Sequence, residues 1–339
     1  MLDIKLVVTS SGKVMDIGTI CEQLQLNWVL EGNAGYMETS YIPKQTVDLV
    51  EGDVVALQVN GRKVFYGWVF RKEVSSDKTT KVKIYDIKRY LAYKDVDVTG
   101  NETIDQFFTR ICTVMKIKHR VVHTSSFILP SKIHDGETYN NMMQYAIDQT
   151  FIGTDGEQRF CIRANDDTLE LVDCLQQTTD VVIGDKILLT SYDYSTDIEN
   201  TYTTFKIQRE ISSEEQKKKN ISKADEILLR KTITEKNQEN VNKWGDLQYY
   251  EKKDSKYTDV QLDEYMKHVM NAYGKQTKSL KLSCLGNFDC IPGNMIILNI
   301  SDLQTEKVAN MVYALITDAT HTIKHNIHTM ELTVEIKEV

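Results

Sequence analysis

The sequence is short of the residues that mark fibrous, disordered and membrane-embedded chains. It has three prolines and 16 glycines among 339 residues, too few for a collagen-like or low-complexity protein. No apolar run approaches the ~18 residues of a membrane helix. The amino terminus alternates like a strand and lacks the basic head and apolar core of a secretion signal. We therefore expect a globular chain of two or three domains.

Paired cysteines and clustered basic residues are also missing. The six cysteines form no CxxC pair, and most lie in apolar runs. This pattern favours buried free thiols in a reducing compartment over disulfides or zinc. The net charge of −8 opposes general nucleic-acid binding, because phosphate contacts need clustered lysine and arginine. The short run Lys217–Lys219 follows two glutamates and is interpreted as a solvated loop.

No short catalytic motif occurs, whether GxSxG, HExxH, a P-loop or GxGxxG. Abundant Asp and Glu leave a carboxylate pair for glycoside hydrolysis open, but Asp166 and Asp167 are better explained as turn residues. His119 and His123 have no carboxylate motif nearby. The aromatic segment Trp244–Tyr250 is either a ligand platform or, as we favour, the chain re-entering the core.

Histidines near the carboxyl terminus come nearest to a metal site. His321 and His325 have a spacing that binds zinc on a helix. The flanking residues instead predict two strands joined at Lys324–Asn326, on which His321 and His328 could approach across the turn. No Glu or Cys completes a site, so we interpret these histidines as a solvated or hydrogen-bonded hairpin surface. The sequence therefore predicts no catalytic residue, no cofactor site and no metal site.

One sequence segment occurs twice, once near each end of the chain. Asp48–Val59 aligns without a gap to Asp289–Ile300: each begins with an acidic residue, turns at Gly-Asp or Gly-Asn and continues into a β-rich run. Two further predicted strands follow each copy, at 64–70 and 80–87 in the first and at 311–316 and 329–336 in the second. We predict a duplicated β unit. The alternative is two unrelated antiparallel meanders, since turn chemistry and period-two patterning are generic.

The segments between the copies have different character. Residues 1–98 carry short strands and turns, typical of a small barrel or sandwich. Residues 99–175 predict a compact α+β insert with helices around 104–115 and from 138, then a hairpin over 159–172. Strands are expected at 181–189 and 202–208. The polar stretch 212–242 predicts an exposed excursion, helical in part at 224–229. A capping box at Thr258 and Gln261 then begins an amphipathic helix that ends at Gly274.

In their order, several segments resemble a known family. They are Val47–Val59 with Phe65–Trp68, Lys243–Tyr250, Leu282–Gly286 leading into Ile291–Asn294, and Ala319–His321 through His328–Leu332. This order resembles the tail hub proteins of PBSX-type prophages and of contractile, diffocin-like phage-tail bacteriocins. More distantly, it is similar to the late control protein D group and the baseplate hub of contractile phages. The resemblance covers nearly the whole chain, and residues 212–242 match least.

The resemblance implies an α+β, mostly β fold with two tube-like antiparallel β-barrels, a small α+β insert and one long amphipathic helix. The implied division is a first barrel at 1–98, the insert at 99–175, a second barrel at 176–211 with 277–339, and the polar excursion with the helix at 212–276. Three such subunits would present six similar barrels, which could adapt a six-fold tail tube to a three-fold spike.

The implied partners are the chain itself as a homotrimer, the tail tube protein, the central spike, LysM-type and other baseplate proteins, and the tape measure protein. No membrane, specific nucleic acid or cofactor is implied. The protein would be assembled in the bacterial cytoplasm and then released at the tail tip. The alternatives are a cell-wall hydrolase, which the length disfavours because barrels and insert use nearly every residue, and a carbohydrate-binding tail component.

Overall fold

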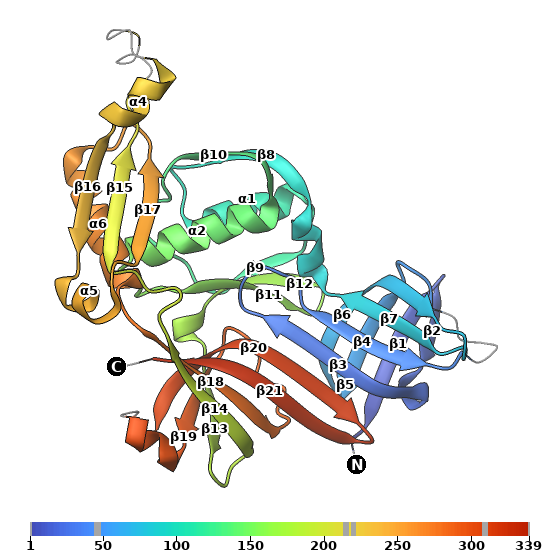
Figure 1. Cartoon of the computed structure of the whole chain (residues 1–339). Helices are drawn as coiled ribbons and strands as arrows, with labels where there is room; N and C mark the ends of the chain where they lie inside the picture. Colours follow the sequence, from blue (N-terminus) through green and yellow to red (C-terminus); the bar gives the residue numbers. More distant parts are fainter. Residues whose placement is uncertain (1, 44–48, 213–216, 218–221, 307–310, 338–339) are drawn as a thin grey trace. The chain divides into compact units, whose positions relative to one another are not determined.

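The computed structural model describes the chain except residues 1, 44–48, 213–216, 218–221, 307–310 and 338–339. The chain is mostly β, with 49% strand and 22% helix, and a mostly β fold with some helices was predicted from the sequence. The chain divides into two compact units (Figure 1). The first contains residues 1–150, 158–195 and 279–339, and the second contains 151–157 and 196–278.

One sheet of 13 strands dominates the first unit. Its early strands are β1 (Ile4–Ser10), β2 (Lys13–Asp16), β3 (Cys21–Val29), β4 (Tyr36–Tyr41), β5 (Val54–Val59), β6 (Arg62–Val74) and β7 (Thr80–Tyr85). Its later strands are β13 (Thr178–Gly184), β14 (Leu189–Asp197), β18 (Thr277–Leu285), β19 (Met295–Asn299), β20 (Val312–Lys324) and β21 (Ile327–Ile336). The main path is β14-β18-β21-β20-β3-β4-β7-β6-β5-β1-β2, with β19 branching from β20 and β13 pairing β19. Among the described residues, no strand pairing closes this path into a ring.

Two separate cores follow from the alternation of these strands. β5 alternates between half-buried and buried positions, so Val55, Leu57 and Val59 point into one core. That core also contains Leu6, Leu26 and other early-strand residues. The second core gathers Leu280, Ile296 and other residues of β18 to β21. The two halves of the sheet therefore fold around a core each.

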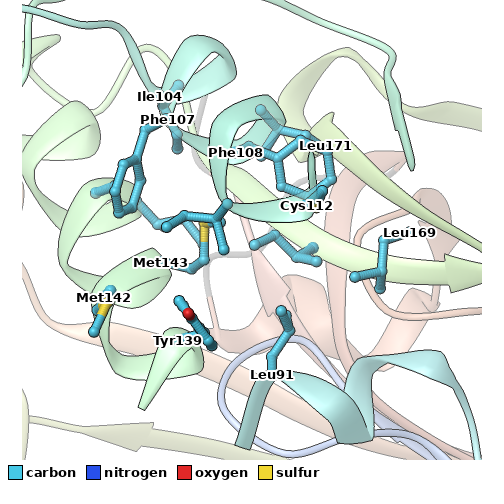
Figure 2. Close-up of a cluster of buried hydrophobic side chains, with 14 of the residues drawn as sticks. Leu91, Ile104, Phe107, Phe108, Cys112, Tyr139, Met142, Met143, Leu169 and Leu171 are labelled. Atoms are coloured by element: carbon cyan, nitrogen blue, oxygen red, sulfur yellow. The ribbon is translucent and has the colours of Figure 1, made fainter. Parts of the chain in front are cut away.

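The rest of the first unit is a smaller α+β region. Its elements are β8 (Lys94–Thr99), α1 (Ile104–Val114), β9 (His119–Val121), β10 (Lys132–Thr138), α2 (Tyr139–Gly153), β11 (Phe160–Asn165) and β12 (Thr168–Asp173). Short 3-10 helices in this unit cover Gly18–Ile20, Ile87–Ala92, Cys174–Gln176 and Ser301–Glu306. Figure 2 shows Phe107, Phe108, Met143 and Leu171 meeting in its core. Both helices and the hairpin were predicted from the sequence, and the structure confirms them.

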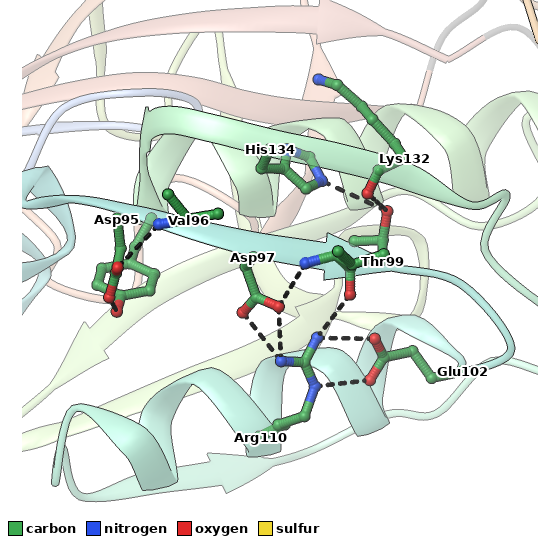
Figure 3. A network of polar contacts seen from close by, with 10 residues as sticks. Asp95, Val96, Asp97, Thr99, Glu102, Arg110, Lys132 and His134 are labelled. Carbon is green, nitrogen blue, oxygen red and sulfur yellow. Dashed lines mark hydrogen bonds and ion pairs between the residues drawn. The ribbon is translucent and has the colours of Figure 1, made fainter.

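Arg110 anchors α1 by its charge. Its guanidinium donates to both oxygens of Asp97 at 2.9 Å and to both oxygens of Glu102 at 2.8 and 3.1 Å (Figure 3). Such two-pronged pairs fix geometry as well as adding energy. Across the same β8–β10 pair, His134 is fully buried between Thr99 and Glu137. This polar network gave no sequence signal.

The second unit is a three-stranded sheet with helices. Its elements are β15 (Thr204–Arg209), α4 (Lys223–Leu229), β16 (Lys231–Lys236), α5 (Gln238–Trp244), β17 (Gln248–Lys253) and α6 (Asp259–Tyr273). The sheet order is β16-β15-β17, with β15 antiparallel to β16 and parallel to β17. Phe205 and Ile207 of β15 pack with Leu262 and Val269 of α6, and Ile152 joins their cluster.

Several expectations for 176–276 need correction. The run 181–189 was predicted as one strand, but a turn after Gly184 divides it between β13 and β14. Strand 202–208 was assigned to the second barrel, but among the described strands β15 pairs with β16 and β17, in a sheet of their own. The polar stretch contains α4, where a helix was predicted, but also β16 and α5, which were missed. Part of 212–242 lies outside the described residues.

The six cysteines are all free, and five of them are buried, as the sequence predicted. Among the described residues, the longest helices fall short of the length and apolar character that a membrane crossing requires. The remaining expected domain boundaries stay predictions.

Candidate assembly surface

The repeated segment forms the same local structure in both copies. Gly52 and Gly293 have φ angles of +93° and +90°. Gly52 N–H donates to Val69 O at 2.8 Å, and Gly293 N–H donates to Ile316 O at 3.0 Å. The return bonds also match, from Val69 N–H to Asp53 O at 2.9 Å and from Ile316 N–H to Asn294 O at 3.0 Å. The two segments therefore lie on equivalent strands, as the predicted duplication requires.

The likeness extends beyond three strands. The first half of the sheet has the order β3-β4-β7-β6-β5-β1, and the second half has the order β14-β18-β21-β20-β19-β13. A bulge follows the matched position in both, between Val69 and Arg71 and between Ile316 and Asp318. The two six-strand units, which we call copy A (β1, β3–β7) and copy B (β13, β14, β18–β21), therefore share order and bulge position.

The copies differ at two places. β5 and β6 are joined by Asn60 and Gly61, both at positive φ, whereas β19 is followed by the short helix Ser301–Glu306. This lengthening was expected from the sequence. In addition, β1 is antiparallel to β5 while β13 is parallel to β19. The second difference has no sequence signal, because period-two patterning is the same in both directions.

Copy A and copy B are joined edge to edge within the chain. β20 of copy B pairs antiparallel with β3 of copy A from Asp318↔Val29 to Lys324↔Gln23. Leu30 N–H extends the ladder by donating to Thr317 O at 2.7 Å. Thr320 and Asn27, directly opposite each other, are also linked by a 3.0 Å side-chain hydrogen bond. The strand edge of one copy is thus satisfied by the other.

The strands that match β3 and β20 in the other copy are β14 and β6. Among the described residues, β14 is at one end of the main path, next to β18. Along β6, the pairing with β5 runs from Arg62 to Trp68 and the pairing with β7 runs from Trp68 to Val74.

The join also explains the histidine pair. His321 Nδ1 lies 2.9 Å from His328 Nε2, so the expected approach across the hairpin is confirmed. The expectation of a surface position is wrong for His321, whose side chain is fully buried. β20 lies between β21 and β3, and the rings of Trp28 and Phe288 contact His321. Sequence patterning did not show that a second sheet edge covers the hairpin.

The hydrogen bonds set the tautomers of the pair. His321 Nε2 lies 2.8 Å from Cys290 O, and because a carbonyl only accepts, Nε2 carries the proton. His321 Nδ1 then accepts from His328 Nε2–H. Burial lowers the pKa of each histidine to about 4, so both are neutral at pH 7.

The other sequence candidates are scattered. His325 lies in the hairpin turn at a φ of +51°, His119 Nδ1 bonds Ile117 O at 2.9 Å, and His123 Nδ1 accepts from Asp173 N–H at 3.0 Å. Asp166, in the β11–β12 turn, has a φ of +58°, which supports the turn interpretation. Within the described part of the chain, no three His, Cys, Asp or Glu side chains gather as a metal site would need.

The aromatic segment Trp244–Tyr250 enters the core only in part. Tyr249 packs with Phe205 and stacks on Tyr273 at 5.9 Å in the second unit. Tyr250 is 51% exposed. The interpretation that this segment re-enters the core is therefore confirmed for Tyr249 and is wrong for Tyr250, because alternate residues of a strand point to opposite faces.

A cavity of about 400 Å³ in the first unit was not foreseen. Its lining includes Trp28, Tyr66 and Arg163, together with the buried pair Asp86 and Lys88. Burial raises the pKa of Asp86 to about 7 and lowers that of Lys88. Burial thus favours the uncharged form of each side chain, and the attraction between Asp86 and Lys88 opposes that effect.

Comparison with known proteins identifies the family of this chain. A model of the YqbQ-like family matches residues 24–335. The chain belongs to the YqbQ-like family. This YqbQ-like chain is 26% identical over 295 residues to YqbQ of Bacillus subtilis (strain 168), covering 84% of this chain and 81% of that protein.

Solved structures share the fold of this YqbQ-like chain. The 43 kDa tail protein of prophage MuSo2 from Shewanella oneidensis has a TM-score of 0.68 at 12% identity, with 98% of each chain covered. The c3393 protein of E. coli has a TM-score of 0.52 at 11% identity, with 94% of this chain and 74% of that chain covered. The latter is described as a component of the type VI secretion system with structural similarity to the T4 bacteriophage tail proteins gp27 and gp5. At these identities the likeness is one of fold.

Proposed function

We propose that this YqbQ-like chain is the structural hub of a contractile tail baseplate and acts without catalysis. Three subunits would bring six copies of one six-strand unit into a ring around a channel. The ring would present six similar faces to a tail tube and three identical subunits to a central spike. The protein would work by shape and by strand-edge complementarity.

The observation that carries this proposal is the internal duplication. Copy A and copy B share a six-strand order, the Gly turn and the bulge after Val69 and Ile316. A symmetric ring repeats one patch at each interface, so a six-fold partner and a three-fold partner can be matched only by an adaptor with both symmetries. A chain with two similar units, used three times, has that property.

The fold relatives point the same way. One is a prophage tail protein and another is described as similar to phage T4 tail proteins gp27 and gp5. The proposed partners are therefore the tail tube protein, the spike, LysM-type and other baseplate proteins and the tape measure protein. The proposed location is the baseplate at the tip of a phage tail or an R-type, phage-tail-like bacteriocin.

Electron microscopy of the isolated particle, reconstructed without imposed six-fold averaging, tests the proposal. We expect three copies of the chain at the tube–spike junction, with copy A and copy B alternating around one axis. Six separate copies per tail, or copies only at fibre ends, would rule out a hub. A peptidoglycan-degradation assay on the purified chain should show no activity, and cleavage would favour the hydrolase alternative.

A further inference from the structure

We propose that the cavity of about 400 Å³ in the first unit binds a small organic carboxylate with an aromatic or apolar body, and that Lys88 holds the carboxylate. The residues that line this cavity all belong to the first unit of a single chain. The site is therefore present in one subunit, and its occupancy does not rest on the proposed function.

Lys88 lines this cavity and lacks a partner for its charge. It lies in the 3-10 helix Ile87–Ala92, and only 6% of its surface is exposed. The ammonium interacts electrostatically with Asp86 and Cys161, which also line the cavity. Among the described residues, however, it makes no hydrogen bond or ion pair, and Asp86 accepts instead from the main-chain N–H of Lys88 at 2.9 Å. Burial of a charge without such a partner is costly, and an acceptor that enters the cavity would lower this cost.

The other buried lysine among the described residues has the partners that Lys88 lacks. Lys253 of the second unit is 5% exposed. Its ammonium donates to Glu251 Oε1 at 2.8 Å and lies 3.5 Å from the ring centroid of Tyr265. Lys88 is buried to a similar degree, but the described residues supply neither a carboxylate at hydrogen-bond distance nor a ring for its ammonium. Burial of a lysine in this chain is therefore compensated at Lys253 and uncompensated at Lys88.

The cavity walls suit an aromatic or apolar body. They come from both copies of the six-strand unit and from the α+β region. Their apolar side chains include Trp28, Phe65, Phe288, Ile291 and Pro292. A volume of about 400 Å³ is within the range of small-molecule pockets, which are mostly apolar with a few polar groups. The exposed residues Arg62 and Lys63 also line the cavity, so it reaches the surface there.

The free donors of the lining match the two oxygens of a carboxylate. The indole N–H of Trp28 has no acceptor among the described residues, so the lining offers this donor together with the Lys88 ammonium. An ionised carboxylate only accepts, and each of its oxygens can take one of these hydrogens. The remaining cations of the lining, Arg62, Lys63 and Arg163, already donate to acceptors within the chain. Lys88 is therefore the cation that is left for a ligand.

Asp86 limits the charge that the ligand can carry. Its carboxylate lines the same cavity and would repel a dianion more strongly than a monoanion. Burial raises the pKa of Asp86 to about 7, so at pH 7 part of the population is protonated and repels an anion less. We therefore expect a monocarboxylate rather than a phosphate dianion.

Binding of phenylacetate to the full-length chain tests the site. Labelling with 5-fluorotryptophan gives one fluorine NMR signal for each of the three tryptophans, and Trp28→Phe identifies the signal of residue 28. We expect phenylacetate to shift the Trp28 signal with half-saturation at about 1 mM or below, and to leave the signal of Trp244 in the second unit unchanged. Benzyl alcohol has the ring without the charge, and acetate has the charge without the ring. Each should need at least about tenfold higher concentrations.

Two lysine variants form a matched pair. Lys88→Met removes the ammonium and keeps an unbranched side chain, so it should weaken phenylacetate binding at least about tenfold. Lys253→Met removes the other buried ammonium and should bind phenylacetate as the unmodified chain does. Circular dichroism checks that both variants are folded. Undiminished binding by folded Lys88→Met, or equal weakening by Lys253→Met, would contradict the role of Lys88.

The unmodified chain decides the question even if a variant does not fold. A Trp28 signal that phenylacetate leaves unmoved would overturn the inference. Binding of benzyl alcohol as tight as that of phenylacetate would overturn it as well, because the cavity would then recognise the ring and not the carboxylate. A Trp28 shift that needs both the ring and the charge would support it.

Discussion

At the scale of single residues, two glycines share a conformation but differ in surroundings. Gly52 and Gly293 both have φ near +90°. A Cβ added to Gly52 would meet nothing within 4 Å, whereas one added to Gly293 would lie 2.7 Å from Cys161 Sγ. The sequence revealed the turn, because Gly before Asp or Asn is a strong local signal. It could not reveal the contact with Cys161, which is 132 residues distant in the chain.

This difference makes a paired prediction. Gly52→Ala should lower the free energy of unfolding by about 1–3 kcal/mol, because an L side chain is strained at that φ. Gly293→Ala should cost more, since it adds a clash to the same strain. The two midpoints of thermal unfolding, measured side by side, check the order. Equal losses would mean that the Cys161 contact relaxes without cost.

The histidine pair predicts a pH dependence. Burial holds the pKa of His321 and His328 at about 4 in the folded chain, below the usual histidine value of ~6.5. Between these values the unfolded chain binds more protons, so stability is fully present above about pH 6.5 and is lost as pH falls toward 4. The thermal midpoint should fall across this window. The loss should be smaller in a His328→Gln variant, in which one titrating group is gone.

Imidazole carbon shifts in an NMR titration would check the same point directly. The two rings interact, so the pair should titrate in two steps rather than as independent sites. A midpoint near 6.5 for both rings would contradict the buried, neutral pair.

At the scale of elements, strong periodicity was predictable and weakly buried elements were not. α1 and α6 were predicted because their apolar residues recur at helical spacing and fill a core. β16 was missed because only Ile233 of its six residues is even half-buried, which removes the alternation that marks a strand. The 181–189 run was joined wrongly because apolar residues flank the Gly184 turn on both sides. The candidate assembly surface was predictable only as a repeat, because the join between the copies pairs β3 with β20, which are far apart in the sequence.

α6 offers an element-scale prediction. Thr258 Oγ1 accepts from Gln261 N–H at 3.2 Å, and Gln261 Oε1 accepts from Thr258 N–H at 2.9 Å. Thr258→Ala should cost about 1 kcal/mol, because it leaves a first-turn amide without its partner. Thr258→Ser keeps the hydroxyl and should preserve stability. Hydrogen exchange of the Gln261 amide distinguishes the two: it should be faster only in the alanine variant.

At the scale of the whole molecule, residues 196–278, which make up most of the second unit, are inserted between the neighbouring strands β14 and β18 of the first. The chain leaves at Ser195 and returns at Ser279, whose hydroxyl oxygens are 2.8 Å apart. A two-residue Asn-Gly turn can join antiparallel strands at such a point. The larger unit has both sheet cores and the α+β core to itself.

Replacing residues 196–278 by Asn-Gly should therefore leave a chain that folds. Ile152 would lose its cluster in the second unit, so the variant also carries Ile152→Ser. We expect a cooperative thermal transition and preserved near-ultraviolet circular dichroism. A chain ending at residue 311, which lacks β20 and β21, is the control and should lose both. If the excised chain also lost them, the first unit would not be an independent folding unit.

The β3–β20 ladder has a consequence for biosynthesis. Thr320 and Asn27 are 293 positions apart, so the ladder has a very high contact order. While the ribosome makes the intervening residues, the outer edge of β3 has no partner. A chain cut short before β20 keeps that edge open, and open edges invite aggregation. The ladder therefore acts as a check on translation: only a chain made as far as β20 covers the outer edge of β3.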